Sequence, residues 1–146
     1  GGFLSDVHCF VLANVLRRPL VIYGDSTACA AGLAGVYLPL LWAAPEECSP
    51  VPTSLLFRSS HFSVLAAFEE SGGRGGGVAL PLACGGSPLR VRFLLREEEA
   101  EEDRILHEWL PNRPSSQDKG IRVYDLPADA ACDALIRIIK GSKRPG

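Results

Sequence analysis

The residues of this chain best suited to chemistry are its five cysteines and three histidines. The cysteines are Cys9, Cys29, Cys48, Cys84 and Cys132. None of them forms a Cys-x-x-Cys pair, so we expect neither a zinc ribbon nor a thioredoxin-type redox site. Their odd number and wide spacing fit reduced thiols better than a disulfide framework, which indicates a reducing compartment. The sequence also lacks a Walker loop, a His-Glu-x-x-His pair and a Gly-x-Ser-x-Gly elbow.

No cysteine has the local setting of a nucleophile, which needs a helix N-terminus or a nearby cation to lower the thiol pKa. Cys9 lies inside an apolar helical pattern, and Cys84 and Cys132 occupy core-like positions. Cys29 lies in a small-residue loop and Cys48 lies among prolines. From its residue pattern alone, the chain therefore offers no preorganised thiolate.

The three histidines differ in their surroundings. His107 stands in an acidic helix and is predicted to be at the surface, whereas His8 stands in an apolar helix and is predicted to be a hydrogen-bonded core residue. His61 follows two serines and precedes Phe62 at a loop-to-strand junction, where an imidazole can be held rigidly with one edge open. His61 is therefore the candidate general base, although on spacing alone a structural or surface role is the more common one.

The first half of the chain predicts a helix that feeds directly into a buried strand, which indicates an α/β (α+β) fold. Ser5 is a good N-cap, and the helix is apolar nearly all round until Pro19 stops it, so we expect it to be buried on most sides. The expected elements are a helix over Ser5–Arg18 and strands over Leu20–Tyr23, Val36–Pro39, Ser54–Arg58 and Phe62–Phe68. The prolines of Ala43–Pro52 indicate a surface connection.

The second half continues with strands and amphipathic helices. Glu97–Leu110 is predicted as a helix with a solvated acidic start over Glu97–Asp103 and one apolar stripe. That stripe is formed by Ile105, Leu106, Trp109 and Leu110. The other expected elements are strands over Val78–Leu82, Leu89–Leu95 and Ile121–Tyr124, loops over Gly72–Gly77 and Pro111–Lys119, and a helix over Asp129–Lys140.

Composition excludes several classes of protein. Of 146 residues, 47% are apolar and 22% charged, which is a globular and not a disordered composition. The formal net charge of -2 gives no reason to expect nucleic acid or an anionic membrane as partner. No run of roughly 18 apolar residues is present that could form a spanning helix. Because the chain contains no Met and begins Gly1-Gly2, we expect it to be a piece of a longer protein.

Several long motifs occur in an order that matches a known family. They are Val7-His-Cys-Phe-Val-Leu-Ala-Asn-Val-Leu-Arg-Arg-Pro-Leu-Val-Ile-Tyr-Gly24, Gly35-Val-Tyr-Leu-Pro-Leu-Leu-Trp42, Cys48-Ser-Pro-Val-Pro52 and His61-Phe-Ser-Val-Leu65. Together they resemble the OTU-type deubiquitinases of the Trabid/Cezanne subgroup, and Gly35–Trp42 looks most like the Trabid branch. Residues 1–70 match well and residues 71–146 match loosely.

This resemblance implies a papain-like fold with a mixed central sheet and flanking helices, here incomplete at the N-terminal helical lobe. Residues 1–146 would be the C-terminal portion of an OTU catalytic domain. The family hydrolyses isopeptide bonds in ubiquitin chains by thiol chemistry, in the cytoplasm and also the nucleus, and needs no metal or cofactor. Its catalytic histidine, the one directly followed by Phe, carries over to His61, with Phe62 and the strand behind it fixing the ring.

The resemblance also identifies what is missing from this sequence. The family's nucleophile belongs to a Gly-Asp-x-Cys type of segment upstream of the Leu-Arg-Arg-Pro helix, and the group that orients the histidine is upstream as well. We therefore expect the chain to be inactive alone, with Cys9 as a small core filler and Ser63 as no substitute for the orienting group. The alternative is a non-catalytic ubiquitin-binding or scaffold module, and linkage preference is not determined by the sequence.

Overall fold

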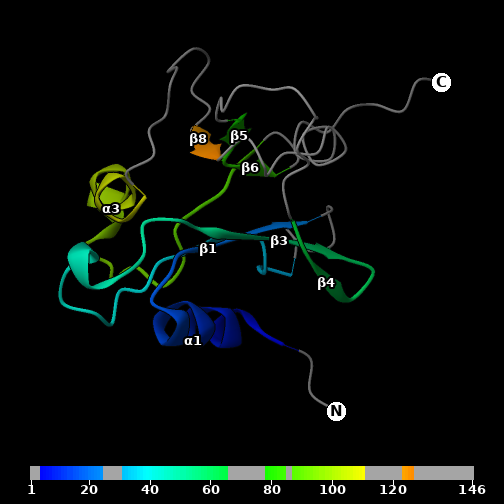
Figure 1. Cartoon of the computed structure of the whole chain (residues 1–146), viewed down its shortest axis with the longest axis horizontal. Coiled ribbons are helices and arrows are strands. Elements are labelled where there is room, and N and C mark those ends of the chain that lie inside the picture. Colours follow the sequence, from blue (N-terminus) through cyan, green and yellow to red (C-terminus); the bar gives the residue numbers. More distant parts are fainter. Residues whose placement is uncertain (1–3, 25–30, 66–77, 85–86, 111–122, 127–146) are drawn as a thin grey trace.

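The computed structural model describes residues 4–24, 31–65, 78–84, 87–110 and 123–126, with only the backbone at 78–81, 84 and 123–126 (Figure 1). Its helices are α1 (Asp6–Leu16), the 3-10 helices η1 (Pro45–Glu47) and η2 (Glu99–Glu101), and α3 (Glu102–Trp109). Its strands are β1 (Leu20–Gly24), β2 (Gly35–Tyr37), β3 (Thr53–Arg58), β4 (His61–Val64), β5 (Val78–Pro81), β6 (Ala83–Cys84), β7 (Ser87–Pro88) and β8 (Val123–Leu126).

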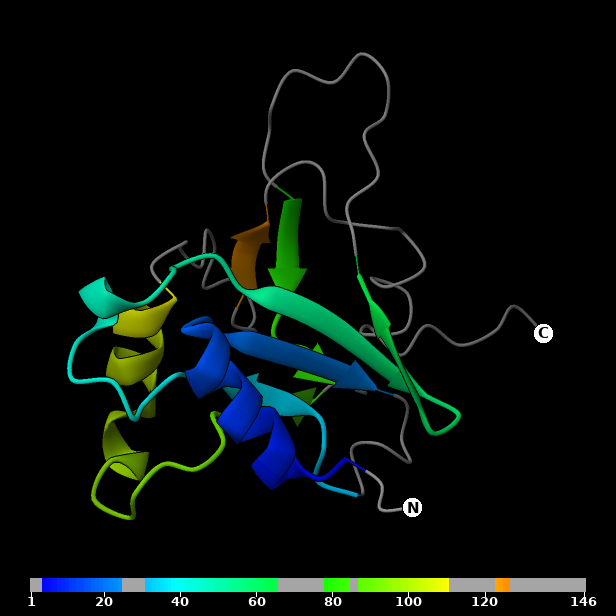
Figure 2. The same ribbon diagram turned by 60° about the horizontal axis from the view of Figure 1, so that its bottom comes forward.

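A four-stranded mixed sheet in the order β2-β1-β3-β4 forms the centre of the molecule. β1 runs parallel to β3 and antiparallel to β2, and β4 runs antiparallel to β3. Two smaller sheets pair β5 with β8 and β6 with β7. Figures 1 and 2 show α1 against one face of the large sheet, while α3 and the small sheets lie on its other side. The mixed sheet with a few helices confirms the predicted α+β class.

β1 is buried along its whole length, as is its shorter neighbour β2. Val21 and Tyr23 belong to the core shared with α3, whereas Leu20 and Ile22 belong to the core beneath α1. All five residues of β1 are buried, so neither face of the strand meets water. This confirms that the unbroken apolar run Leu20–Tyr23 is a strand covered on both sides.

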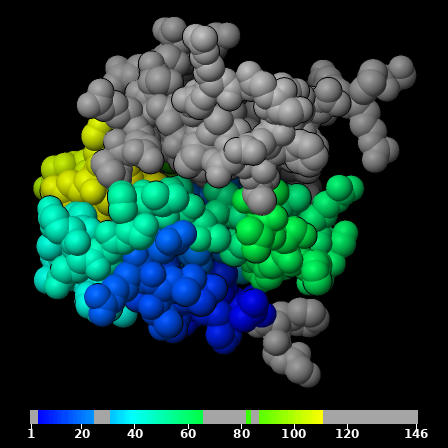
Figure 3. All heavy atoms as spheres, in the orientation of Figure 1, coloured from blue at the N-terminus to red at the C-terminus, as the bar shows by residue number. Residues whose placement is uncertain are grey.

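α1 begins after Ser5 as predicted, but the expectation that it is buried on most sides is wrong. Its buried residues are Cys9, Ala13 and Asn14, on the face toward the sheet. The apolar side chains on its other faces are exposed, and Figure 3 shows the helix (blue) at the surface. These exposed residues are Val7, Val11, Leu12, Val15 and Leu16. The sequence is apolar all round, but one sheet face can cover only one side of a helix.

The predicted strand Leu89–Leu95 is also absent. Within it, a single parallel bridge joins Val91 to Val36, and Phe93 takes a φ of 63°, which ends any extended run. Leu89 and Val91 are buried but Leu95 is exposed, so the apolar alternation does not define one buried face. The segment instead covers the edge of β2, because the Arg92 N–H donates to the Val36 carbonyl and the Val36 N–H donates to the Arg90 carbonyl.

The acidic start of the second helix contains one residue that is not solvated, which corrects the prediction for Glu97–Asp103. Glu102 is buried, accepts a hydrogen bond from the Val91 N–H at 2.7 Å and pairs with Arg90 at 2.9 Å. The predicted apolar stripe is confirmed, since Ile105, Leu106, Trp109 and Leu110 are all buried. Glu102 lies one turn before Ile105 and Leu106, so it shares the inward face.

The remaining boundaries differ by a few residues or fall outside the described parts of the chain. β2 is shorter than the predicted Val36–Pro39, β4 begins at His61 instead of Phe62, and β8 lies two residues after Ile121–Tyr124. The predictions for Gly72–Gly77, Pro111–Lys119, Asp129–Lys140, Cys29 and Cys132 lie outside the described residues. Within the described ranges, no helix has the length and apolarity required to cross a membrane.

Gly35 provides a test of the contact between β2 and the Arg90–Arg92 segment. A Cβ at this position would lie 2.7 Å from Arg92 Cγ and 3.1 Å from the Arg90 carbonyl oxygen. We expect Gly35→Ala to lower the free energy of unfolding by about 1–3 kcal/mol, as overpacked sites do. Urea unfolding monitored by tryptophan fluorescence measures the change.

The matched control is Gly35→Ala combined with Arg92→Ala, which removes the closest clashing atoms. Each single change and the double change are measured together, so that the coupling between the two sites is obtained. The double variant should lose less stability than the two single losses added together. Additive losses would contradict the close approach of Gly35 to Arg92.

Candidate functional site

His61 is the first residue of β4 and stands at the tip of the β3–β4 hairpin. Its backbone pairs with Arg58, the last residue of β3, so the hairpin loop consists of Ser59 and Ser60 alone. The His61 side chain is exposed. β3 in turn pairs with β1 along five positions, which ties the hairpin to the buried centre of the sheet. The structure thus places His61 at the predicted loop-to-strand junction, with its imidazole accessible.

The residue after His61 anchors this end of the sheet. Phe62 pairs with Phe57 across the two strands, and their rings lie 4.7 Å apart at 54°. Both rings pack on the core beneath α1, which includes Cys9. Because successive side chains of a strand point to opposite faces, the imidazole of His61 extends on the face away from α1. The aromatic pair holds the strand in place while the imidazole stays open.

The turn before His61 has an uncommon backbone for its sequence. Ser59 and Ser60 have φ angles of 51° and 61°, so both adopt the left-handed region. This is the φ pattern of a type I′ turn, which prefers Asn-Gly because the left-handed conformation costs a residue with a Cβ about 1–2 kcal/mol. The two-residue turn therefore joins β3 directly to β4, and its left-handed backbone lowers the stability of the folded chain.

The other histidines have structural or surface positions. His8 is exposed, which corrects its prediction as a core residue. Its Nδ1 accepts the Ser5 N–H at 2.9 Å and lies 2.8 Å from the Ser5 hydroxyl, so it closes the first turn of α1. His107 is exposed on α3, as predicted. Neither residue belongs to the β3–β4 hairpin that carries His61.

The two cysteines whose side chains are described do not suit nucleophilic catalysis. Cys9 is buried, and desolvation followed by the nearby Asp6 carboxylate raises its pKa to about 11. Partial burial also raises the pKa of Cys48 above its ordinary value, although Arg17 opposes the shift. Both are free thiols. Cys9 is the small core filler that the sequence predicted, and neither residue has the lowered pKa of a thiolate nucleophile.

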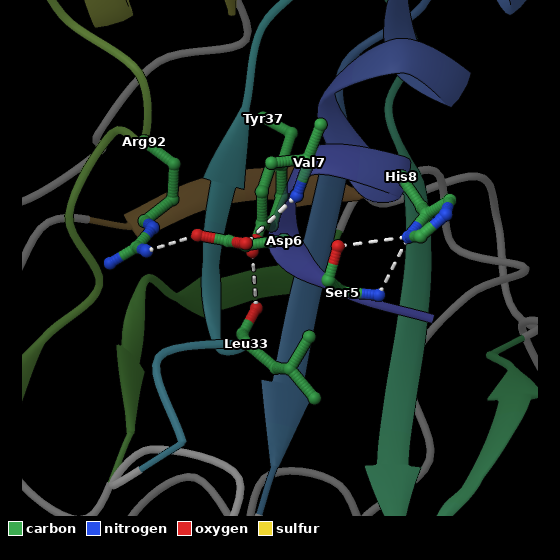
Figure 4. A network of polar contacts seen from close by, with 7 residues as sticks. All are labelled: Ser5, Asp6, Val7, His8, Leu33, Tyr37 and Arg92. Carbon is green, nitrogen blue, oxygen red and sulfur yellow. Dashed lines mark hydrogen bonds and ion pairs between the residues drawn. The ribbon is translucent and has the colours of Figure 1, made fainter. Parts of the chain in front are cut away.

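A polar network at the start of α1 joins segments that are distant in sequence (Figure 4). One Asp6 oxygen accepts the Val7 N–H at 2.9 Å, and the other pairs with Arg92 at 2.9 Å. The Tyr37 hydroxyl donates to the Leu33 carbonyl at 2.7 Å, and burial raises the pKa of Tyr37. The contact between Asp6 and Arg92 has no sequence signature because 86 positions separate the two residues.

A second network joins the motif residues of α1 to the segment after β2. Asn14 donates from its amide nitrogen to the Phe10 carbonyl and accepts the Leu41 N–H with its amide oxygen, both at 2.9 Å. The Trp42 indole donates to the Asn14 carbonyl at 2.9 Å, and the Arg17 guanidinium lies 3.8 Å from the Trp42 ring centroid. These motif residues therefore fix α1 to the segment after β2, and their contacts indicate a structural role.

The described residues contain no cluster of three or more histidine, cysteine, aspartate or glutamate side chains that could hold a metal ion. The candidate catalytic group among the described side chains is the exposed imidazole of His61. Alone, a neutral imidazole can accept and return a proton near neutral pH, but it needs a partner group to act on.

Comparison with known proteins finds relatives of this chain in mammals and in an insect. No family model matches the chain. Tumor necrosis factor alpha-induced protein 3 from Mus musculus and from Homo sapiens is 34% identical over 118 residues, which is 73% of this chain and 15% of each relative. Ubiquitin thioesterase trabid from Drosophila melanogaster is 33% identical over 126 residues, which is 75% of this chain and 16% of that protein. The chain thus spans a small part of the relatives it matches.

The raised pKa of Cys9 predicts slow alkylation. Only the thiolate reacts with iodoacetamide, and a pKa of about 11 leaves about one thiol in a thousand ionised at pH 8. We expect Cys9 to stay unmodified at pH 8 in the folded chain and to react more than tenfold faster at pH 10. Mass spectrometry of peptides after timed alkylation measures both rates. The chain unfolded in guanidinium is the control, and rapid labelling of folded Cys9 at pH 8 would contradict its burial.

Proposed function

Because the chain belongs to the OTU-type deubiquitinase family, as a Trabid-like member, we propose that it is part of a thiol protease acting on ubiquitin and polyubiquitin chains. The bond cleaved joins the C-terminal carbonyl of one ubiquitin to an amine of a lysine. Residues 1–146 form the C-terminal portion of the catalytic domain in this proposal. The observation that carries it is the exposed imidazole of His61 in the family motif His-Phe-Ser-Val-Leu, at the tip of an anchored hairpin.

His61 acts first as base and then as acid in the proposed reaction. It takes the proton of a cysteine thiol, and the thiolate attacks the carbonyl carbon of the isopeptide bond. The imidazolium then gives its proton to the departing lysine amine, which leaves an acyl-enzyme thioester. In the second half, His61 takes a proton from water, the hydroxide attacks the thioester, and the proton returns to the thiolate sulfur. An accessible ring on a fixed strand suits both transfers.

The nucleophile comes from polypeptide outside this sequence in the same proposal. Burial and a raised pKa argue against Cys9 as this nucleophile, and the pKa of Cys48 is raised as well. Cys29, Cys84 and Cys132 lack a sequence setting that would lower a thiol pKa. The family pattern puts its cysteine at the start of a helix, where the helix dipole favours a thiolate. The chain therefore supplies the base, and a second segment supplies the sulfur.

Replacement of His61 tests its role directly. In the full-length protein that contains this sequence, we expect His61→Ala to lower kcat for diubiquitin cleavage by about 10³-fold or more, because the thiol loses its general base. His107→Ala is the matched control, since His107 is an exposed histidine on α3, and its kcat should stay unchanged. Gel-based cleavage of diubiquitin of each linkage provides the rates, and undiminished turnover by His61→Ala would refute the assignment.

The isolated chain provides a second test. We expect the 146-residue polypeptide to cleave no diubiquitin, because a histidine without its thiol forms no acyl-enzyme. Cleavage that is abolished by replacing one of its own cysteines would show that the nucleophile lies within the chain. A full-length protein that binds ubiquitin chains and leaves every linkage intact would instead be the non-catalytic scaffold.

A further inference from the structure

The strained turn before His61 is adjacent to the proposed base. Four non-glycine residues among the described ranges have positive φ, and two of them, Ser59 and Ser60, are consecutive. They form the whole loop between Arg58 and His61. Unfavourable backbone conformations persist where the surrounding structure requires them, and they are concentrated at functional sites.

Because β4 is short and pairs with a strand on one side within the described residues, the turn has a large part in placing the imidazole of His61. Within the described residues, β4 has one strand neighbour, β3, and it is four residues long. Its backbone pairs with β3 at four positions, and His61 forms the last of these pairs, between the Phe57–Phe62 ring contact and the turn. A two-residue loop with negative φ would splay the strands, and a one-residue slip in register would move His61 to the opposite face.

We infer that Ser59 and Ser60 are positioning residues for His61, and that they act through their left-handed backbone and not through their hydroxyl groups. The inference rests on the proposed function, because it assigns His61 the role of base. The turn sets the direction in which the imidazole projects from the sheet, while the packing of Phe62 holds β4 against the core beneath α1. Both serines are exposed, so neither side chain is needed to fill the core.

The test compares variants that keep the positive φ with one that forbids it. Ser59→Asn with Ser60→Gly retains the turn and removes the strain, because Asn-Gly is the preferred type I′ pair. Ser60→Pro forces φ to about -65° and excludes the observed turn. All variants are made in the full-length protein, and kcat and KM are measured with a fluorogenic ubiquitin C-terminal amide, together with the melting temperature.

For Ser59→Asn/Ser60→Gly we expect a higher melting temperature and a kcat within twofold of the wild-type value. For Ser60→Pro we expect kcat to fall on the order of 10²-fold, as a displacement of about 1 Å can cause, with KM changed less than threefold. Ser60→Val, whose β-branched side chain disfavours positive φ, provides the same comparison if the proline variant does not fold. It should lower kcat by a smaller factor.

Two results would overturn the inference. Loss of kcat in Ser59→Asn/Ser60→Gly would show that the hydroxyls act directly, and full kcat in folded Ser60→Pro would show that the turn does not position His61. The wild-type protein and His61→Ala are measured in the same series. An inactive wild type or an active His61→Ala would reject the proposed function, and this outcome is distinct from either result for the turn.

Discussion

The parallel pairing of β1 with β3 is the interaction on which the rest of the structure depends. β1 is buried on both faces, so it requires α1 on one side and α3 with the small sheets on the other. Its five register pairs with β3 carry the β3–β4 hairpin outward from this core. The position of His61 is therefore set by a chain of backbone contacts that begins in the fully buried strand β1 and ends at an exposed edge.

The motif residues that identify the family are mainly structural. Asn14 and Trp42 join α1 to the segment after β2 through two hydrogen bonds, and Arg17 covers the Trp42 ring. The junction between α1 and β1 is closed in the same way, since the Arg17 and Pro19 carbonyls accept the N–H groups of Ser49 and Thr53. Such contacts need particular side chains at fixed positions. The segments that carry them therefore resemble the family, although these side chains take no direct part in a reaction.

Much of the apolar surface of α1 is exposed. α1 buries the side that carries Cys9 and Ala13 and exposes a stripe that includes Val7, Val11 and Val15. A solvated helix of this length ordinarily carries polar residues on its outer face. His61 is exposed on the hairpin, whereas burial raises the pKa of both described thiols, Cys9 and Cys48. Among the described residues, the accessible imidazole is therefore not accompanied by a thiol of lowered pKa.

The sequence by itself determined the elements whose patterns are local. Leu20–Tyr23 is apolar without a break and therefore a covered strand, Ser5 begins α1, and Ile105 and Trp109 repeat at helical spacing. The motif His61-Phe62 also identified the candidate base without coordinates. Only the tertiary structure decided the burial of Glu102, the contact of Asp6 with Arg92, the exposure of His8 and the left-handed turn at Ser59–Ser60. These features depend on partners brought together from distant parts of the chain, or on a turn geometry that two serines do not encode, so no local period in the sequence records them.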